Sequence, residues 1–187
     1  TGLVVRLKAG IDRGLTNRWT YLPKTTLAGE TEKGKASISE IDKNDYLLEA
    51  TANYTKTLGQ DHNFNVLAGV SGEKFVNQEN SSGNSGFITD AFLWNNLGSG
   101  SGTKTVSSTG SENRMASYFG RLNYIYKDRY YTTFTLRTDG ASVFGENNKW
   151  ATFPSLALGW NIANESFFGN LKNTVSQLKL RFSYGQT

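Results

Sequence analysis

The sequence predicts an all-β chain in which antiparallel strands form part of an up-and-down transmembrane β-barrel. Three observations lead to this fold class. Apolar and polar residues alternate with a period of two in seven segments, most of these segments are long, and the connections between them differ systematically in length. A strand that crosses a membrane needs about 9–11 residues, whereas a soluble strand usually has about 5–6.

The alternation is clearest near the C-terminus, where Leu156, Leu158 and Trp160 share one side of the predicted strand. The seven predicted strands, each with its apolar positions, are residues 3–12 (Leu3, Val5, Leu7, Ala9, Ile11), 46–55 (Tyr46, Leu48, Ala50, Ala52, Tyr54), 63–71 (Phe64, Val66, Ala68, Val70), 117–126 (Tyr118, Leu122, Tyr124, Tyr126), 130–139 (Tyr130, Phe134, Leu136), 150–162 (Leu156, Leu158, Trp160, Ile162) and 178–184 (Leu178, Leu180, Phe182, Tyr184). The fourth is imperfect, because Phe119 and Ile125 fall on its polar side.

We expect the apolar sides to touch lipid and the other sides to line a polar lumen. Basic residues fall on the lumen side, namely Arg6, Lys8, Arg121, Arg137 and Arg181. Aromatic residues gather near the ends of the apolar sides, where a membrane barrel carries its aromatic girdles. The predicted girdle residues are Tyr46, Tyr54, Tyr118, Tyr126, Tyr130 and Tyr184.

The predicted connections fall into two groups. Residues 59–62 and 127–129 make short turns, and residues 164–177 form a medium segment that could carry a short helix. The intervening connections, 14–44, 72–113 and 140–152, are predicted to be longer loops. Membrane barrels have short periplasmic turns and long external loops, and they close with an even number of at least eight strands. About seven strands therefore predict an incomplete barrel, and both ends of the chain look cut.

The composition restricts the other classes of protein. The chain has no run of about 18 apolar residues, so a helical membrane protein is not expected. It has no cysteine for a disulfide or thiolate site, and its net charge of +4 is spread out, without the basic arm of a nucleic-acid-binding protein. We expect neither an enzyme nor a cofactor.

Single residues that could carry chemistry have simpler interpretations. His62 is expected to be an exposed turn residue, because no metal-binding partners are evident. Asp139, Glu146 and Glu165 are read as loop and turn residues rather than as an acid–base pair. The Gly/Ser-rich stretches at 82–86 and 98–111 are interpreted as flexible surface loops, since no phosphate-binding spacing follows them.

Aromatic residues in the predicted long loops could stack on sugar rings, although packing against a neighbouring loop is the more ordinary role. These residues are Trp19, Tyr21, Phe87, Phe92 and Trp94. We take Trp19, Phe92, Trp94 and the lumen-facing Arg137 as weak candidates for substrate binding. Arg137 and Asp139 could equally form a cross-strand ion pair with Arg121 or Arg181.

The sequence also resembles the central barrel of the SusC/RagA family of TonB-dependent outer-membrane receptors. The resemblance covers about two thirds of the chain and includes the hairpin at residues 53–73. The pieces that carry it are Tyr118-Phe119-Gly120-Arg121-Leu122-Asn123-Tyr124, Asp128-Arg129-Tyr130, Arg137-Thr138-Asp139-Gly140, Phe144-Gly145, Asn147-Asn148-Lys149-Trp150, Phe153-Pro154-Ser155 and Leu178-Lys179-Leu180-Arg181.

This resemblance implies that residues 1–187 are part of the C-terminal barrel domain of a receptor in the outer membrane of a Gram-negative bacterium. It implies energy-driven import of glycans or peptides, with a SusD-like surface lipoprotein above the barrel and an N-terminal plug that couples to TonB. We expect the plug to lie outside residues 1–187. Two alternatives remain open: a passive porin or adhesive barrel, and a soluble β-sandwich binding module.

Overall fold

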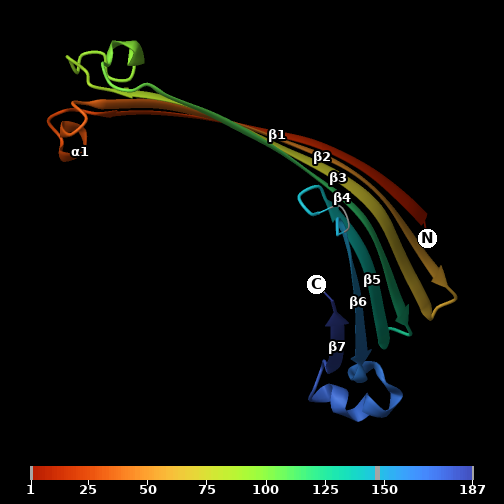
Figure 1. Cartoon of the computed structure of the whole chain (residues 1–187). Coiled ribbons are helices and arrows are strands. Elements are labelled where there is room, and N and C mark those ends of the chain that lie inside the picture. The colour runs from red at the N-terminus through yellow and green to blue at the C-terminus, as the bar shows by residue number, and fades with distance from the viewer. Residues whose placement is uncertain (1, 146–147, 187) are drawn as a thin grey trace. The chain divides into compact units, whose positions relative to one another are not determined.

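The strands follow one another in a single sheet. The computed structural model describes residues 2–145 and 148–186, apart from the side chains of residues 170, 172 and 173. The seven strands lie in sequence order, so each is hydrogen-bonded to the strand that precedes it (Figure 1). They are β1 (Gly2–Leu22), β2 (Lys35–Leu58), β3 (His62–Ser85), β4 (Thr105–Tyr126), β5 (Tyr130–Ala141), β6 (Trp150–Asn161) and β7 (Lys179–Gly185). The prediction of an all-β up-and-down sheet is confirmed.

Helical structure is limited to short segments in the connections. These are α1 (Leu27–Glu30) and the 3-10 segments η1 (Leu97–Ser99), η2 (Ile162–Asn164) and η3 (Ser166–Asn173). The last two occupy the medium connection, where a short helix was expected. Within the described residues, no helix is both long and apolar enough to cross a membrane.

The first four strands are about twice as long as predicted, at 21, 24, 24 and 22 residues. Much of the expected loops 14–44 and 72–113 is therefore strand, which reduces these connections to residues 23–34 and 86–104. Of the two Gly/Ser-rich stretches that were interpreted as flexible loops, residues 82–85 and 105–111 belong to strands. A backbone ladder needs no apolar side chains, so the pattern that marks a lipid-facing strand does not report these extensions.

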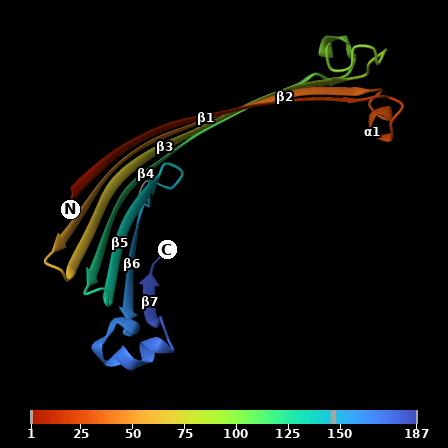
Figure 2. The same ribbon diagram turned by 180° about the vertical axis from the view of Figure 1, so that it is seen from behind.

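The chain divides into two compact units. The first comprises Thr1–Gly10, Leu47–Glu73 and Arg114–Thr187, and the second comprises Ile11–Tyr46 and Lys74–Asn113. The first unit holds β5, β6 and β7 together with the alternating parts of β1 to β4. The view from behind shows the same order of strands (Figure 2).

The register of the first unit separates the two faces of the sheet. Leu122 pairs with Phe134, Phe134 with Leu156, and Leu156 with Tyr184, so apolar residues form a continuous row. On the neighbouring row, Arg121 pairs with Thr135, Thr135 with Ser155, and Ser155 with Gly185. The first row belongs to what we call the apolar face and the second to the polar face.

The described residues contain almost no internal hydrophobic core. Four hydrophobic residues are buried, Ala36, Phe87, Ala163 and Phe168, and none of these lies on the apolar face of the first unit. Large side chains of that face remain exposed, including Phe134 at 43% and Phe182 at 63%. A sheet that stays folded with such a face uncovered needs an apolar environment around it.

The second unit is held together by polar and aromatic contacts around the ends of its strands. The buried amide of Asn84 donates to the carbonyl oxygens of Leu97 and Gly100 at 2.8 and 2.9 Å. The ring of Tyr21 meets Phe87 edge-on with centroids 5.8 Å apart. These contacts order the connection after β3.

Candidate functional site

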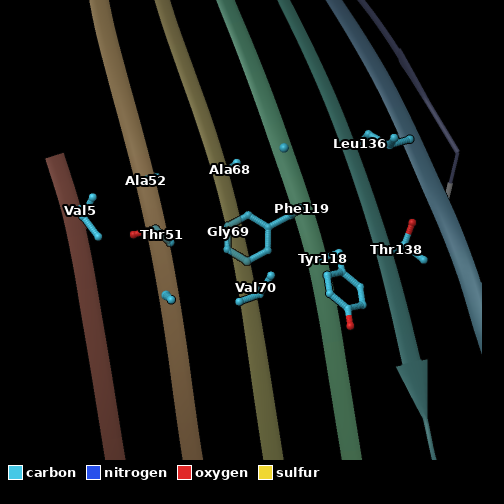
Figure 3. A pocket seen from close by; sticks show the side chains of 12 residues that line it. Val5, Thr51, Ala52, Ala68, Gly69, Val70, Tyr118, Phe119, Leu136 and Thr138 are labelled. Carbon is cyan, nitrogen blue, oxygen red and sulfur yellow. The ribbon is translucent and has the colours of Figure 1, made fainter. Parts of the chain in front are cut away.

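The apolar face of the first unit is lined by small side chains at its centre. Figure 3 shows Ala52, Ala68 and Val70 from neighbouring strands at a shallow depression that Tyr118 and Leu136 border. The depression has a volume of about 460 Å³. Its lining is predominantly hydrocarbon, so an acyl chain matches its chemistry better than water does.

Aromatic residues collect at both limits of the apolar face. Near the β4–β5 turn, the ring of Tyr126 stacks on Tyr130 at 6.3 Å, and Tyr130 pairs with Trp160. At the opposite end, the ring of Tyr118 stacks on Trp150 at 5.7 Å. These positions agree with the expected girdles, whereas Tyr184 pairs with Leu156 inside the apolar row.

His62 belongs to the first of these aromatic groups. It is the first residue of β3 and is only partly exposed, and its Nδ1 lies 2.8 Å from the Tyr124 hydroxyl. Its ring also lies 4.9 Å from that of Tyr126. The expectation of an exposed turn residue was therefore wrong. Parity could have corrected it, since His62 is two residues before the apolar Phe64.

A row of amides crosses the polar face. Asn65 donates to Asn53 at 2.8 Å, Asn123 donates to Asn65 at 3.3 Å, and Thr133 donates to Asn123 at 2.8 Å. We call these four residues the amide ladder; it joins β2, β3, β4 and β5. Because its groups satisfy one another, it gives a polar surface that carries no charge of its own.

Two arginines lie beside the amide ladder. Arg6 and Arg121 line the same hollow of about 240 Å³ as Asn53, Asn65 and Asn123. Neither guanidinium forms an ion pair with an acidic group among the described residues. Both therefore keep donors available for solutes or for another part of the protein.

The Arg137 guanidinium is occupied by one residue of its own strand and one residue of β4. It donates through Nε to both carboxylate oxygens of Asp139 at 2.8 Å and through Nη2 to Ser117 at 2.9 Å. Residues i and i+2 of one strand share a face, which lets Arg137 reach Asp139. Among the described residues, Asp139 forms no ion pair with Arg121 or Arg181, so the suggested cross-strand pair is not formed there. The geometry leaves Arg137 a weaker candidate for substrate contact than Arg121.

Phe119 is the apolar residue that interrupts the alternation of its strand, and its ring occupies a specific position on the polar face. Its ring lies over Gly69 of β3, where an added Cβ would come within 2.4 Å of it (Figure 3). The Arg137 guanidinium lies 5.4 Å from the centre of the ring on the same face. An aromatic residue beside a strand glycine is a known way of covering exposed backbone.

The aromatic residues of the second unit have different environments. Trp19 and Trp94 line one hollow of about 410 Å³ together with Ile38 and Asn95, whereas Phe92 is half-exposed outside it. Trp19 lies in β1 rather than in a loop, as does Tyr21. The structure brings together two of the three aromatic candidates for substrate binding, and it places Arg137 in the other unit.

Tyr21 and Phe87 have a structural role instead. Phe87 is buried, and the Tyr21 hydroxyl donates to the Asp90 carboxylate at 2.5 Å. Burial, followed by the hydrogen bond and the charge of Asp90, raises the pKa of Tyr21 to about 12. The hydroxyl therefore remains a donor, which fixes the chain that follows β3.

Glu165 is a residue whose role the sequence did not reveal. Its carboxylate accepts hydrogen bonds from Tyr130 at 2.6 Å, Trp160 at 2.9 Å and Arg129 at 3.1 Å. The hydrogen bonds of Tyr130 and Trp160 are the main causes that lower the pKa of Glu165. It is a buried anchor for the segment between β6 and β7, while Glu146 lies outside the described residues.

The similarities to known proteins agree with this geometry. The chain is 38% identical over 186 residues to TonB-dependent receptor P3 of Formosa agariphila, matching all of this chain and 18% of that receptor. It is 53% identical over 77 residues to TonB-dependent receptor SusC of Bacteroides thetaiotaomicron, which covers 41% of this chain and 8% of the receptor. The chain thus spans less than a fifth of the length of these curated relatives.

A solved structure shows the same fold. A chain of the RagAB peptide transporter superposes with a TM-score of 0.87 at 25% identity, and the match covers 98% of this chain and 20% of that chain. No family model matches the sequence. The two faces of the sheet, the strand order and these relatives together lead to one assignment. The chain belongs to the SusC/RagA family of TonB-dependent receptors and forms a segment of their β-barrel.

Proposed function

We propose that the chain forms part of the channel wall of a TonB-dependent nutrient importer in the outer membrane of a Gram-negative bacterium. The observation that carries this proposal is the two-faced sheet of the first unit. Its apolar face lies between aromatic rows, and its polar face carries the amide ladder with Arg6 and Arg121 beside it. The relatives are receptors and transporters rather than enzymes.

The substrate class is a glycan or a peptide. The name of the RagAB transporter supports a peptide, because it is called a peptide transporter. The hollow with Trp19 and Trp94 supports a sugar, since a pyranose ring presents an apolar C–H face to an aromatic ring and hydroxyl groups to an amide such as Asn95. A SusD-like surface lipoprotein, such as the partner that this family uses, would deliver either substrate.

The proposal implies a direction across the membrane. The short turns at 59–61 and 127–129 and the segment 162–178 would face the periplasm, and the connections 23–34 and 86–104 would face outward. Cysteines introduced at Ser101 and Asp128 of the complete receptor can be labelled on intact cells with a membrane-impermeant reagent. Labelling at Asp128 but not at Ser101 would reverse this orientation.

Energy coupling distinguishes an importer from a passive porin. Uptake of a panel of oligosaccharides and oligopeptides should be measured in cells that carry the complete receptor, with and without a functional TonB. Uptake that persists without TonB would support a passive pore instead. Trp19→Ala and Trp94→Ala should reduce uptake of the transported glycan more than Phe92→Ala, which serves as the matched control outside the hollow.

A further inference from the structure

The segment between β6 and β7 starts at the edge of the apolar face. Trp160 lies on that face, since it pairs with Tyr130 on one side and with Leu180 on the other. The chain then turns through η2, and Ala163 and Glu165 become buried. The segment is therefore tied to one limit of the apolar face from its first residues.

Glu165 fixes the direction in which the chain continues. Its Oε1 accepts from both Tyr130 and Trp160, and its Oε2 accepts from Arg129. A second tie comes from the Asn164 amide, which donates to the carbonyl oxygen of Asp128 at 2.9 Å. Three donors on one buried carboxylate hold the start of η3 against the ends of β5 and β6.

This anchoring leaves two large apolar side chains of η3 uncovered. Phe168 is buried at 5%, whereas Phe167 is 68% exposed and Leu171 is 56% exposed. The Phe167 ring also meets the Trp160 ring edge-on, with centroids 6.5 Å apart. Phe167 thus extends the aromatic row that Tyr130 and Trp160 form at the limit of the apolar face.

We propose that η3 lies in the membrane interface and inserts Phe167 and Leu171 into the lipid leaflet. This rests on the proposed function, in which the aromatic row faces lipid; the continuity of Phe167 with that row identifies lipid as its partner. A short apolar helix edge at this depth can bury its side chains among acyl chains while its polar backbone stays near the headgroups. Glu165 acts as a positioning residue for this insertion.

The test uses the complete receptor in vesicles of phosphatidylethanolamine and phosphatidylglycerol, prepared with and without brominated acyl chains. An environment-sensitive dye is attached to a single cysteine in Phe167→Cys, Leu171→Cys, Leu158→Cys or Asp128→Cys. Leu158 on the apolar face is the lipid-exposed reference, and Asp128 in the β4–β5 turn is the water-exposed reference. Vesicles that contain only the receptor leave lipid as the available partner.

We expect the dye at positions 167 and 171 to emit at shorter wavelength than at 128 and to lose intensity in brominated lipid. Emission and quenching at 167 and 171 that match those at 128 would overturn the proposal. Adding Glu165→Gln should weaken quenching at 167 but not at 158, where retained quenching shows that the barrel is still inserted. Equal quenching at 167 with and without Glu165→Gln would refute the positioning role.

Discussion

An arginine placed on the apolar face should be far more costly than one placed next to it on the polar face. Phe134 lies four residues from the aromatic row at Tyr130, which is about 14 Å along a strand. A strand tilt of roughly 35–45° reduces this to about 10–11 Å of depth, close to half of an apolar band about 25 Å tall. Phe134 is therefore near the midplane, and Phe134→Arg should destabilise the receptor by about 2–4 kcal/mol.

The neighbouring residue supplies the control. Thr135 pairs with Arg121 and Ser155 on the polar face, where an added arginine reaches water but opposes a like charge. Thr135→Arg should cost about 1 kcal/mol or less. Leu136→Arg, on the apolar face but nearer the interface, should fall between the two variants. Denaturant titration of the complete receptor in bilayers measures the order, and a larger loss for Thr135→Arg than for Phe134→Arg would show that the faces are assigned backwards.

Three further predictions concern single contacts. Gly69→Ala should cost about 1–3 kcal/mol because its Cβ would meet the Phe119 ring, and the double variant with Phe119→Ala should cost less than the sum; additive losses in denaturant titration would contradict the contact. Asn84→Ala should cost about 1–3 kcal/mol and speed hydrogen exchange at residues 97–102, because it removes the donor to the carbonyl oxygens of Leu97 and Gly100; unchanged exchange would contradict this. Because the pKa of Glu165 is lowered, its stabilising effect should be complete above about pH 4.5 and disappear as the pH falls through the folded pKa. Melting temperatures measured against pH should show this acid-dependent loss in the unmodified receptor but not in Glu165→Gln. Parallel pH profiles of the two proteins would refute the prediction.

Much of the first unit could be predicted from the sequence because lipid on one side imposes a strict period of two. The strand order, the two tight turns and the separation of Leu136 from Thr135 follow from that period. The exceptions were local. Phe119 lies on the polar face because Gly69 leaves room for its ring, and a strand read alone cannot show its neighbour's glycine.

The candidate site was harder to predict. The pairing of Arg137 with Asp139 follows from parity, but cross-strand partners were equally consistent with the sequence. The amide ladder depends on register, and single-strand patterns do not fix register. Glu165 carries no spacing signal, because its three donors come from the β4–β5 turn, the start of β5 and the end of β6. Trp19 was assigned to a loop because apolar and polar residues do not alternate in the sequence around it.

The limit of the membrane-spanning part can nevertheless be located from the sequence. Beyond that limit, charged residues occupy positions that the alternation assigns to the apolar face. Arg13 lies two residues after Ile11 in β1 and forms an ion pair with Asp42 of β2 at 3.2 Å. Lys74 of β3 likewise forms an ion pair with Glu112 of β4 at 2.9 Å.

Exposed ion pairs of this kind contribute little in water, whereas charged side chains cost several kcal/mol to place in lipid. The lipid boundary therefore lies before these pairs on each strand. On β2 it leaves Tyr46 to Tyr54 as the apolar span, nine residues of a strand that has 24. That length agrees with the roughly 9–11 residues needed to cross a bilayer at a tilt. We expect the rest of β2 to meet water on both faces, which would remove the reason for alternation and account for its loop-like sequence.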